Sequence, residues 1–112
     1  MSLQTVDAST FQSAVRENEV TLVEFGAEWC PPCKVLLPIL EEMDREEGGR
    51  AAILQVDCDE SPELASAYGV MSMPTVIVFH RGEPADKFVG LRPKSVYQTA
   101  LARYRSGETD AG

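Results

Sequence analysis

The chain has 112 residues, 44% of them apolar, which is enough for one globular domain with a single hydrophobic core. Its net charge of −8 argues against nucleic acid and against an anionic membrane surface as partners. No run approaches the roughly eighteen consecutive apolar residues that a membrane-spanning helix needs, so we expect no membrane segment. The three cysteines are too few for a disulfide scaffold, and their odd number suits a reducing compartment.

The two ends of the chain give one expectation each. Residues 1–6 show no basic stretch followed by an apolar one, so we expect no signal peptide and a cytoplasmic protein. Residues 106–112 are small or polar, and we expect a flexible tail there, after a single domain over residues 1–105.

The periodicity of apolar residues predicts nine secondary-structure elements. We expect strands at 3–6, 20–25, 52–58, 75–80 and near 87–89. We expect helices at about 8–18, from the Cys30/Cys33 pair to about 47, at 61–69 and at 92–104. This order puts parallel strands first and an antiparallel hairpin last. It is typical of an α/β fold in which helices cover a mixed sheet.

Local signals predict the ends of several helices. Asp7 can cap the first helix, and Ser61 followed by Pro62 can begin the third. The glycines at 48–49 can end the second helix, in which Pro38 should cause a kink.

A Cys-Pro-Pro-Cys motif at 30–33 lies between a predicted buried strand and a predicted amphipathic helix. Two cysteines at this spacing can close a disulfide ring or bind a metal, and the strand–turn–helix context favours the redox use. Zinc needs four ligands, and the other candidates, Cys58 and His80, are not clustered with the pair, so we expect no metal site. Cys30 lies at the helix start, where unpaired N–H groups favour a thiolate, and is the expected nucleophile. Cys33, one turn further and more covered, is the expected resolving thiol.

Six short motifs, in the same order along the chain, resemble those of the thioredoxin family. They are Glu28-Trp29-Cys30, Cys33-Lys34, Pro38-Ile39-Leu40, Tyr68-Gly69-Val70, Met73-Pro74-Thr75 and Val89-Gly90. The resemblance spans about residues 3–104 and implies a thioredoxin fold, with a central mixed five-stranded sheet flanked by four helices. It also implies a monomeric protein-disulfide reductase that works through a Cys30/Cys33 dithiol–disulfide couple and needs no cofactor. Its partners would be disulfide-containing client proteins and a thioredoxin reductase that restores the reduced form.

Glu24 is an acidic residue within an apolar run. An exposed charge at a strand edge is the alternative, but the neighbours Val23 and Phe25 indicate a central strand. A buried carboxyl stays protonated to higher pH than an exposed one. The resemblance implies that Glu24 is a catalytic residue that accepts the proton of Cys33. Gln55 stands where relatives often have a lysine, which should make Glu24 harder to ionise.

Further residues around the motif are expected to bind clients. Met73-Pro74 resembles the cis-proline segment of the family, which lies against the disulfide and pairs with a substrate strand. The expected client-binding residues are Trp29, Pro31, Pro32, Met73, Pro74, Val89, Gly90 and Leu91. Pro31 replaces the glycine usual in the family, and two consecutive prolines remove two N–H donors that could stabilise the Cys30 thiolate. Gly26 stands where many relatives have a second aromatic residue, which changes the packing beneath the motif.

For three residues we also considered an interpretation without a functional role. Cys58 alternates with two apolar residues on the core face of its strand, so we expect a buried structural thiol. His80, at a strand end near a turn, is expected at the surface. Trp29 could be a core residue, but its place beside the cysteines favours a surface role.

Two alternatives to a reductase remain open. An exported thiol oxidant or isomerase would use the same motif, and a signal sequence upstream would favour it. A non-catalytic binding or holdase module, with or without zinc, is the alternative from another class. The reduction potential of the cysteine pair separates reductant from oxidant, because a low value marks a reductant.

Overall fold

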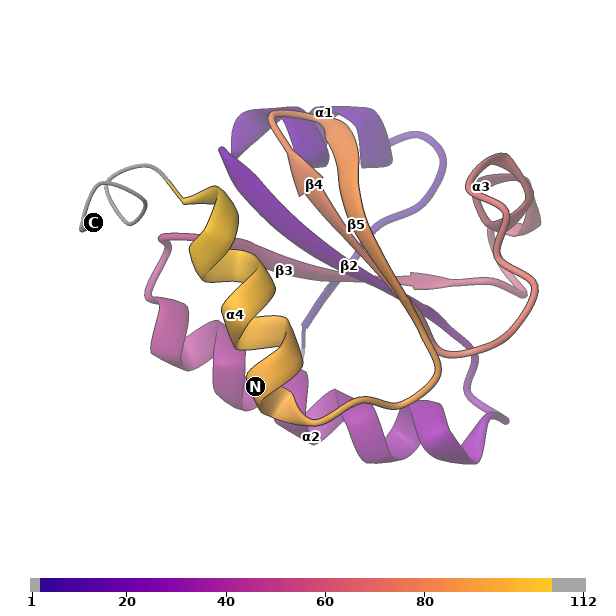
Figure 1. The fold of residues 1–112 in the computed structure, drawn as a ribbon. Helices are drawn as coiled ribbons and strands as arrows, with labels where there is room; N and C mark the ends of the chain where they lie inside the picture. Colours follow the sequence, from indigo (N-terminus) through magenta and orange to yellow (C-terminus); the bar gives the residue numbers. More distant parts are fainter. Residues whose placement is uncertain (1–2, 106–112) are drawn as a thin grey trace.

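A computed structural model describes residues 3–105, so the predicted tail at 106–112 lies outside the described residues. Five strands form one sheet in the order β1-β3-β2-β4-β5 (Figure 1). The strands are β1 Gln4–Thr5, β2 Val20–Gly26, β3 Ala52–Asp57, β4 Thr75–His80 and β5 Glu83–Val89, and the helices are α1 Phe11–Glu17, α2 Pro31–Glu47, α3 Pro62–Ala67 and α4 Lys94–Tyr104.

The sheet is mixed, as the resemblance implied. Strands β1, β3 and β2 are parallel, whereas β4 is antiparallel to β2 and β5 is antiparallel to β4. Helix α1 connects β1 to β2 and helix α2 connects β2 to β3, whereas β4 and β5 form a hairpin. These connections confirm the predicted five-stranded sheet with four helices.

Helices cover both faces of the sheet, which gives the molecule three layers (Figure 1). On one face α2 and α4 contribute apolar side chains, including Leu36, Leu40, Tyr97 and Leu101, to a core with inward residues of β2, β3 and β4. On the other face α1 and α3 contribute Phe11, Val15 and Leu64 to a second core. Every residue of β2 is buried because the strand is central and covered on both faces.

Two elements differ from their predicted bounds for identifiable reasons. The first helix begins at Phe11 rather than near residue 8. The Asp7 carboxylate accepts the N–H groups of Ser9 and Thr10, so it caps a turn that precedes the helix. Strand β5 begins at Glu83, because Arg81 and Gly82 have φ values of 54° and 87° and form the two-residue turn of a tight hairpin.

Helix α2 continues through Pro38 to Glu47 and ends where Gly48 adopts a left-handed conformation with φ of 58°. Ser61 lies at the start of α3, as predicted, but its side chain makes no capping hydrogen bond there. No helix within residues 3–105 is long and apolar enough to cross a membrane.

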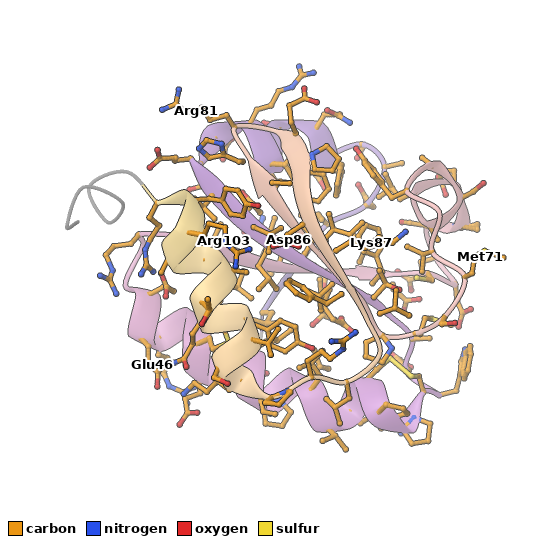
Figure 2. All side chains as sticks on the ribbon, viewed as in Figure 1. Glu46, Met71, Arg81, Asp86, Lys87 and Arg103 are labelled. Carbon is orange, nitrogen blue, oxygen red and sulfur yellow. A yellow bond between two sulfur atoms is a disulfide. The ribbon has the colours of Figure 1, made fainter. Side chains whose placement is uncertain are left out.

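The last helix is tied to the edge of the sheet by charged groups. Arg103 on α4 lies 2.7 Å from Asp86 on β5, and both are visible where α4 passes the hairpin (Figure 2). Because β5 is an edge strand, Pro84 can occupy it without removing a hydrogen bond from the interior of the sheet. Strand β2 lies between β3 and β4 in this sheet, and the chain runs from its end to the cysteine motif.

Candidate active site

The cysteine motif begins directly after the loop that follows β2, and Cys30 is the N-cap residue of α2. A disulfide joins Cys30 to Cys33, and the two Cα atoms are 5.3 Å apart. Cys30 Sγ accepts the N–H of Cys33 at 3.4 Å, which is the bond that a capping side chain makes to the third helical residue. Both residues are buried, with 4% and 2% of their surface exposed. Position on the helix, rather than exposure, therefore distinguishes the two sulfur atoms.

The first two helical positions are Pro31 and Pro32, which have no N–H to donate. A capping side chain accepts from the second or third helical residue, so the donor missing at the sulfur is that of Pro32. Pro31, at the first position, removes an N–H that a cap does not normally use. From the sequence alone the two prolines are equivalent, each lacking one N–H donor, and the helix geometry separates them.

Glu24 lies in the middle of β2 and is only 2% exposed. Burial, and secondarily the negative charge of Asp57, raises the pKa of Glu24 to about 7. Within residues 3–105 its Oε2 atom has no hydrogen-bond partner. The structure agrees with the predicted direction of this pKa and adds Asp57 as a cause. The alternation of side chains along β3 already indicates this second cause, because it places Asp57 on the same face as Gln55, opposite to the face of Val56.

A cavity of about 520 Å³ extends from the solvent to Glu24 and Cys33. Gln55 and Asp57 of β3 and Lys34 of α2 are among the residues that line it. Glu24 and Gln55 are direct neighbours in the register of β2 and β3. The cavity thus brings together the carboxyl, the neutral residue opposite it and the sulfur of the inner cysteine.

The peptide bond between Met73 and Pro74 is cis, as the resemblance implied. The Met73 carbonyl oxygen lies 3.7 Å from Cys30 Sγ. Pro74 is buried, and its carbonyl oxygen accepts the N–H of Gly90 at 2.8 Å. This bond holds the predicted client-binding segment around Gly90 beside the disulfide.

Several apolar side chains around the disulfide are exposed. Trp29 is 62% exposed, which excludes core packing, and its Nε1–H donates to Asp59 at 2.7 Å. Val89 and Leu91 are also exposed, and Met73 is half-buried. Met71, which the sequence analysis did not single out, is 94% exposed and projects from the molecule (Figure 2). Its position two residues before Met73 is the signal that could have identified it.

Cys58 and His80 lie outside the disulfide site. Cys58 is half-buried rather than buried, because it follows the last residue of β3 and contacts the second core only in part. Burial, together with the charges of Glu24, Asp57 and Asp59, raises the pKa of its thiol to about 11. His80 lies at the opposite end of β4 from the disulfide, with its ring 5.6 Å from that of Tyr104. No group of three potential ligands placed to hold a metal ion occurs in the described part of the chain.

Comparison with known proteins gives consistent matches over almost the whole chain. The thioredoxin family model matches residues 2–103. Thioredoxins of Staphylococcus epidermidis and Staphylococcus aureus are 50% and 49% identical over 104 residues, which cover 93% of this chain and 99% of each relative.

Two solved structures support the same assignment. A mutant thioredoxin from Halobacterium salinarum superposes with a TM-score of 0.87 at 32% identity, covering 94% of this chain and 92% of the other. Thioredoxin from Plasmodium falciparum gives a TM-score of 0.82 at 31% identity, covering 91% and 99%. The chain therefore belongs to the thioredoxin family, and it is a thiol–disulfide oxidoreductase that reduces protein disulfides with a Cys-x-x-Cys couple.

Proposed function

We propose that Cys30 is the nucleophile of this reductase and Cys33 the resolving thiol. The observation that carries this assignment is the position of Cys30 Sγ, which caps α2 and accepts an N–H from its first turn. Such N–H groups, with the helix dipole, favour negative charge, so Cys30 is the cysteine better suited to react as a thiolate.

The reaction then has two exchange steps. The Cys30 thiolate attacks one sulfur of the client disulfide, so a Cys30–client bond forms, the client disulfide breaks, and the released client thiolate takes a proton. Cys33 next attacks Cys30 Sγ, which forms the Cys30–Cys33 disulfide and releases the second client thiolate. The client is reduced by two electrons and the protein is oxidised by two.

Glu24 is the proposed acceptor of the Cys33 proton in the second step. Both residues are buried and line the same cavity, so the carboxyl is an acceptor close to the thiol. A base works best when its pKa is close to the working pH, and the pKa of Glu24 is about 7. The carboxylate can therefore take the proton and later release it to solvent at neutral pH.

Clients would dock on the client surface, by which we mean Trp29, Met71, Met73, Val89 and Leu91. Exposed apolar groups gathered around a reactive site are typical of protein-binding surfaces. Pro31 and Pro32, which are exposed, would form part of the same docking area, and buried Pro74 and half-buried Gly90 would shape it from below. We further propose that a thioredoxin reductase restores the dithiol, and that the protein works in the cytoplasm as a monomer.

Trapping of mixed disulfides tests the assignment of the two cysteines. Cys33→Ser should form a stable mixed disulfide with insulin or with clients in a lysate, because the second exchange step is lost. Cys30→Ser should form none, and both variants should fail to reduce insulin. Adducts with Cys30→Ser but not with Cys33→Ser would reverse the two roles. Reduction of the oxidised wild type by a purified thioredoxin reductase tests the proposed electron donor.

A further inference from the structure

Gly26, the last residue of β2, lies at the point where Glu24 and Cys33 meet. A Cβ atom built on Gly26 would overlap Oε2 of Glu24 and lie 3.0 Å from both Glu24 Cδ and Cys33 Sγ. Because both atoms lie 3.0 Å from the same point, Glu24 Cδ and Cys33 Sγ are separated by at most twice 3.0 Å. The φ angle of Gly26 is not in the left-handed region, so the backbone itself does not require glycine.

The geometry of the strand explains this crowding. Residues 24 and 26 point to the same face of the sheet, because side chains alternate along a strand. The Glu24 side chain extends along this face and fills the space that a side chain at position 26 would occupy. This space is also part of the cavity that reaches the solvent.

We propose that Gly26 is a positioning residue for the second exchange step, because its missing side chain lets the Glu24 carboxyl lie beside Cys33 Sγ at the inner end of the cavity. The proton would pass from the Cys33 thiol to the Glu24 carboxylate and then through the cavity to solvent. This inference rests on the proposed role of Glu24 as proton acceptor and adds the feature that holds the carboxyl in place.

Replacing Gly26 with alanine should move the carboxyl and leave the fold in place. The overlapping atom is the end of a flexible side chain, so rotation of Glu24 relieves this overlap, while Cys33 Sγ, 3.0 Å from the added atom, must give way by a few tenths of an ångström. Displacement of a catalytic group by about 1 Å can reduce a rate by about 100-fold. We therefore expect release of the client from the mixed disulfide to slow by at least about tenfold in Gly26→Ala.

The test is rapid-mixing measurement of two rates across the pH range from 5 to 9, with a fluorescent disulfide peptide as client. Attack by Cys30 should be unchanged, since the three atoms nearest the added Cβ belong to Glu24 and Cys33. Release in the wild type should rise with pH as Glu24 ionises, and Gly26→Ala should weaken this rise. The other charged or titratable groups that face the carboxyl are Asp57 on β3, Cys58 after it, Lys34 on α2 and Tyr97 on α4. Burial raises the pKa of the Cys58 thiol to about 11, which lies above the range measured.

Glu24→Gln supplies the matched background. Gly26→Ala should slow release less than twofold in that background, because the amide that it displaces cannot accept the proton. Glu24→Asp combined with Gly26→Ala should recover part of the lost rate, since the shorter side chain keeps a carboxylate and leaves space for the added methyl group. This pair also provides a folded variant if Gly26→Ala alone is unstable.

The outcomes separate the two proposals. If Glu24→Gln slows release but Gly26→Ala does not, or if Gly26→Ala slows it equally in both backgrounds, the positioning role is wrong and the role of Glu24 stands. If Glu24→Gln leaves the release rate and its pH profile unchanged, Glu24 is not the acceptor and both proposals fail.

Discussion

Neutralising Glu24 should make the oxidised protein more stable at neutral pH. In Glu24→Gln the buried carboxyl becomes a neutral amide of nearly the same shape, which resembles the protonated acid. The wild type must either bury a charge or keep a proton bound, and burial raises the pKa of Glu24 from 4.5 to about 7. The variant has no such ionisation, so its stability lacks this dependence on pH.

The sign and size of the effect follow from proton linkage. A carboxyl with a raised pKa binds more protons in the folded state than in the unfolded state between pH 4.5 and about 7. Its contribution to stability is complete below pH 4.5 and is lost as pH rises through this window. Each unit of pKa difference corresponds to 1.36 kcal/mol, so the wild type should lose about 3 kcal/mol relative to Glu24→Gln. Total stabilities of roughly 5–15 kcal/mol make a difference of this size easy to measure.

Urea unfolding of both oxidised proteins at intervals of pH measures this difference directly. Subtracting the two free energies of unfolding removes the contribution of the titrating groups that do not interact with Glu24, and leaves that of Glu24 with the groups coupled to it. Asp57→Asn is a matched variant, because its amide oxygen can still accept the N–H groups of Asp59 and Glu60 that Asp57 now caps. Asp57→Asn removes only the charge of Asp57, which is the smaller of the two causes of the raised Glu24 pKa. In this background the difference in unfolding free energy caused by Glu24→Gln should therefore be slightly smaller. A difference that stays constant with pH would show that the carboxyl is solvated, and the argument for its burial would be wrong.

Two smaller predictions concern the cysteines and prolines. Cys58→Ala should lose about 1 kcal/mol of stability or less, because the thiol is half-buried, and should reduce insulin at the wild-type rate; a lower turnover would contradict its structural role. Pro32→Ala restores the N–H of the second helical residue, and a hydrogen bond to a charged group contributes about 1.5 kcal/mol, so iodoacetamide should alkylate Cys30 up to about tenfold faster near neutral pH. Pro31→Ala is its control and should change this rate little, and equal acceleration in both variants would show that loop stiffness governs the thiolate.

Much of the fold could be predicted because the apolar pattern repeats with a clear period. The run at 20–25 and the β-branched run at 75–80 gave strands close to their observed bounds. Strand β5 was recognised only at its end, because the edge strand begins with Glu83 and Pro84 and lacks a buried face that would show alternation. Asp7 was assigned to a helix that begins four residues later, since the same side chain can cap a turn or a helix.

The sequence proposes the site residues one by one, but it does not give the distances between them. The pattern of β3 places Gln55 and Asp57 on one face, yet only the register of β2 beside β3 shows that this face meets Glu24. Met71 shows how exposure also depends on the fold, because an apolar residue in a loop between α3 and β4 carries no periodic pattern to assign it to the surface.

Gly26 shows most clearly where sequence reasoning stops and why the structure changes the interpretation. A glycine among apolar residues indicates missing packing, and from the sequence alone this suggests a weakness beneath the cysteines. In the structure a carboxyl fills that space, and its burial has two opposite consequences. It destabilises the folded protein at neutral pH, because the raised pKa of Glu24 sets a cost on its ionisation, and the same pKa of about 7 suits the proposed role of Glu24 as a base at neutral pH. An exposed glutamate would spare the protein this loss of stability, but it would be a weaker base and would not reach the buried sulfur of Cys33.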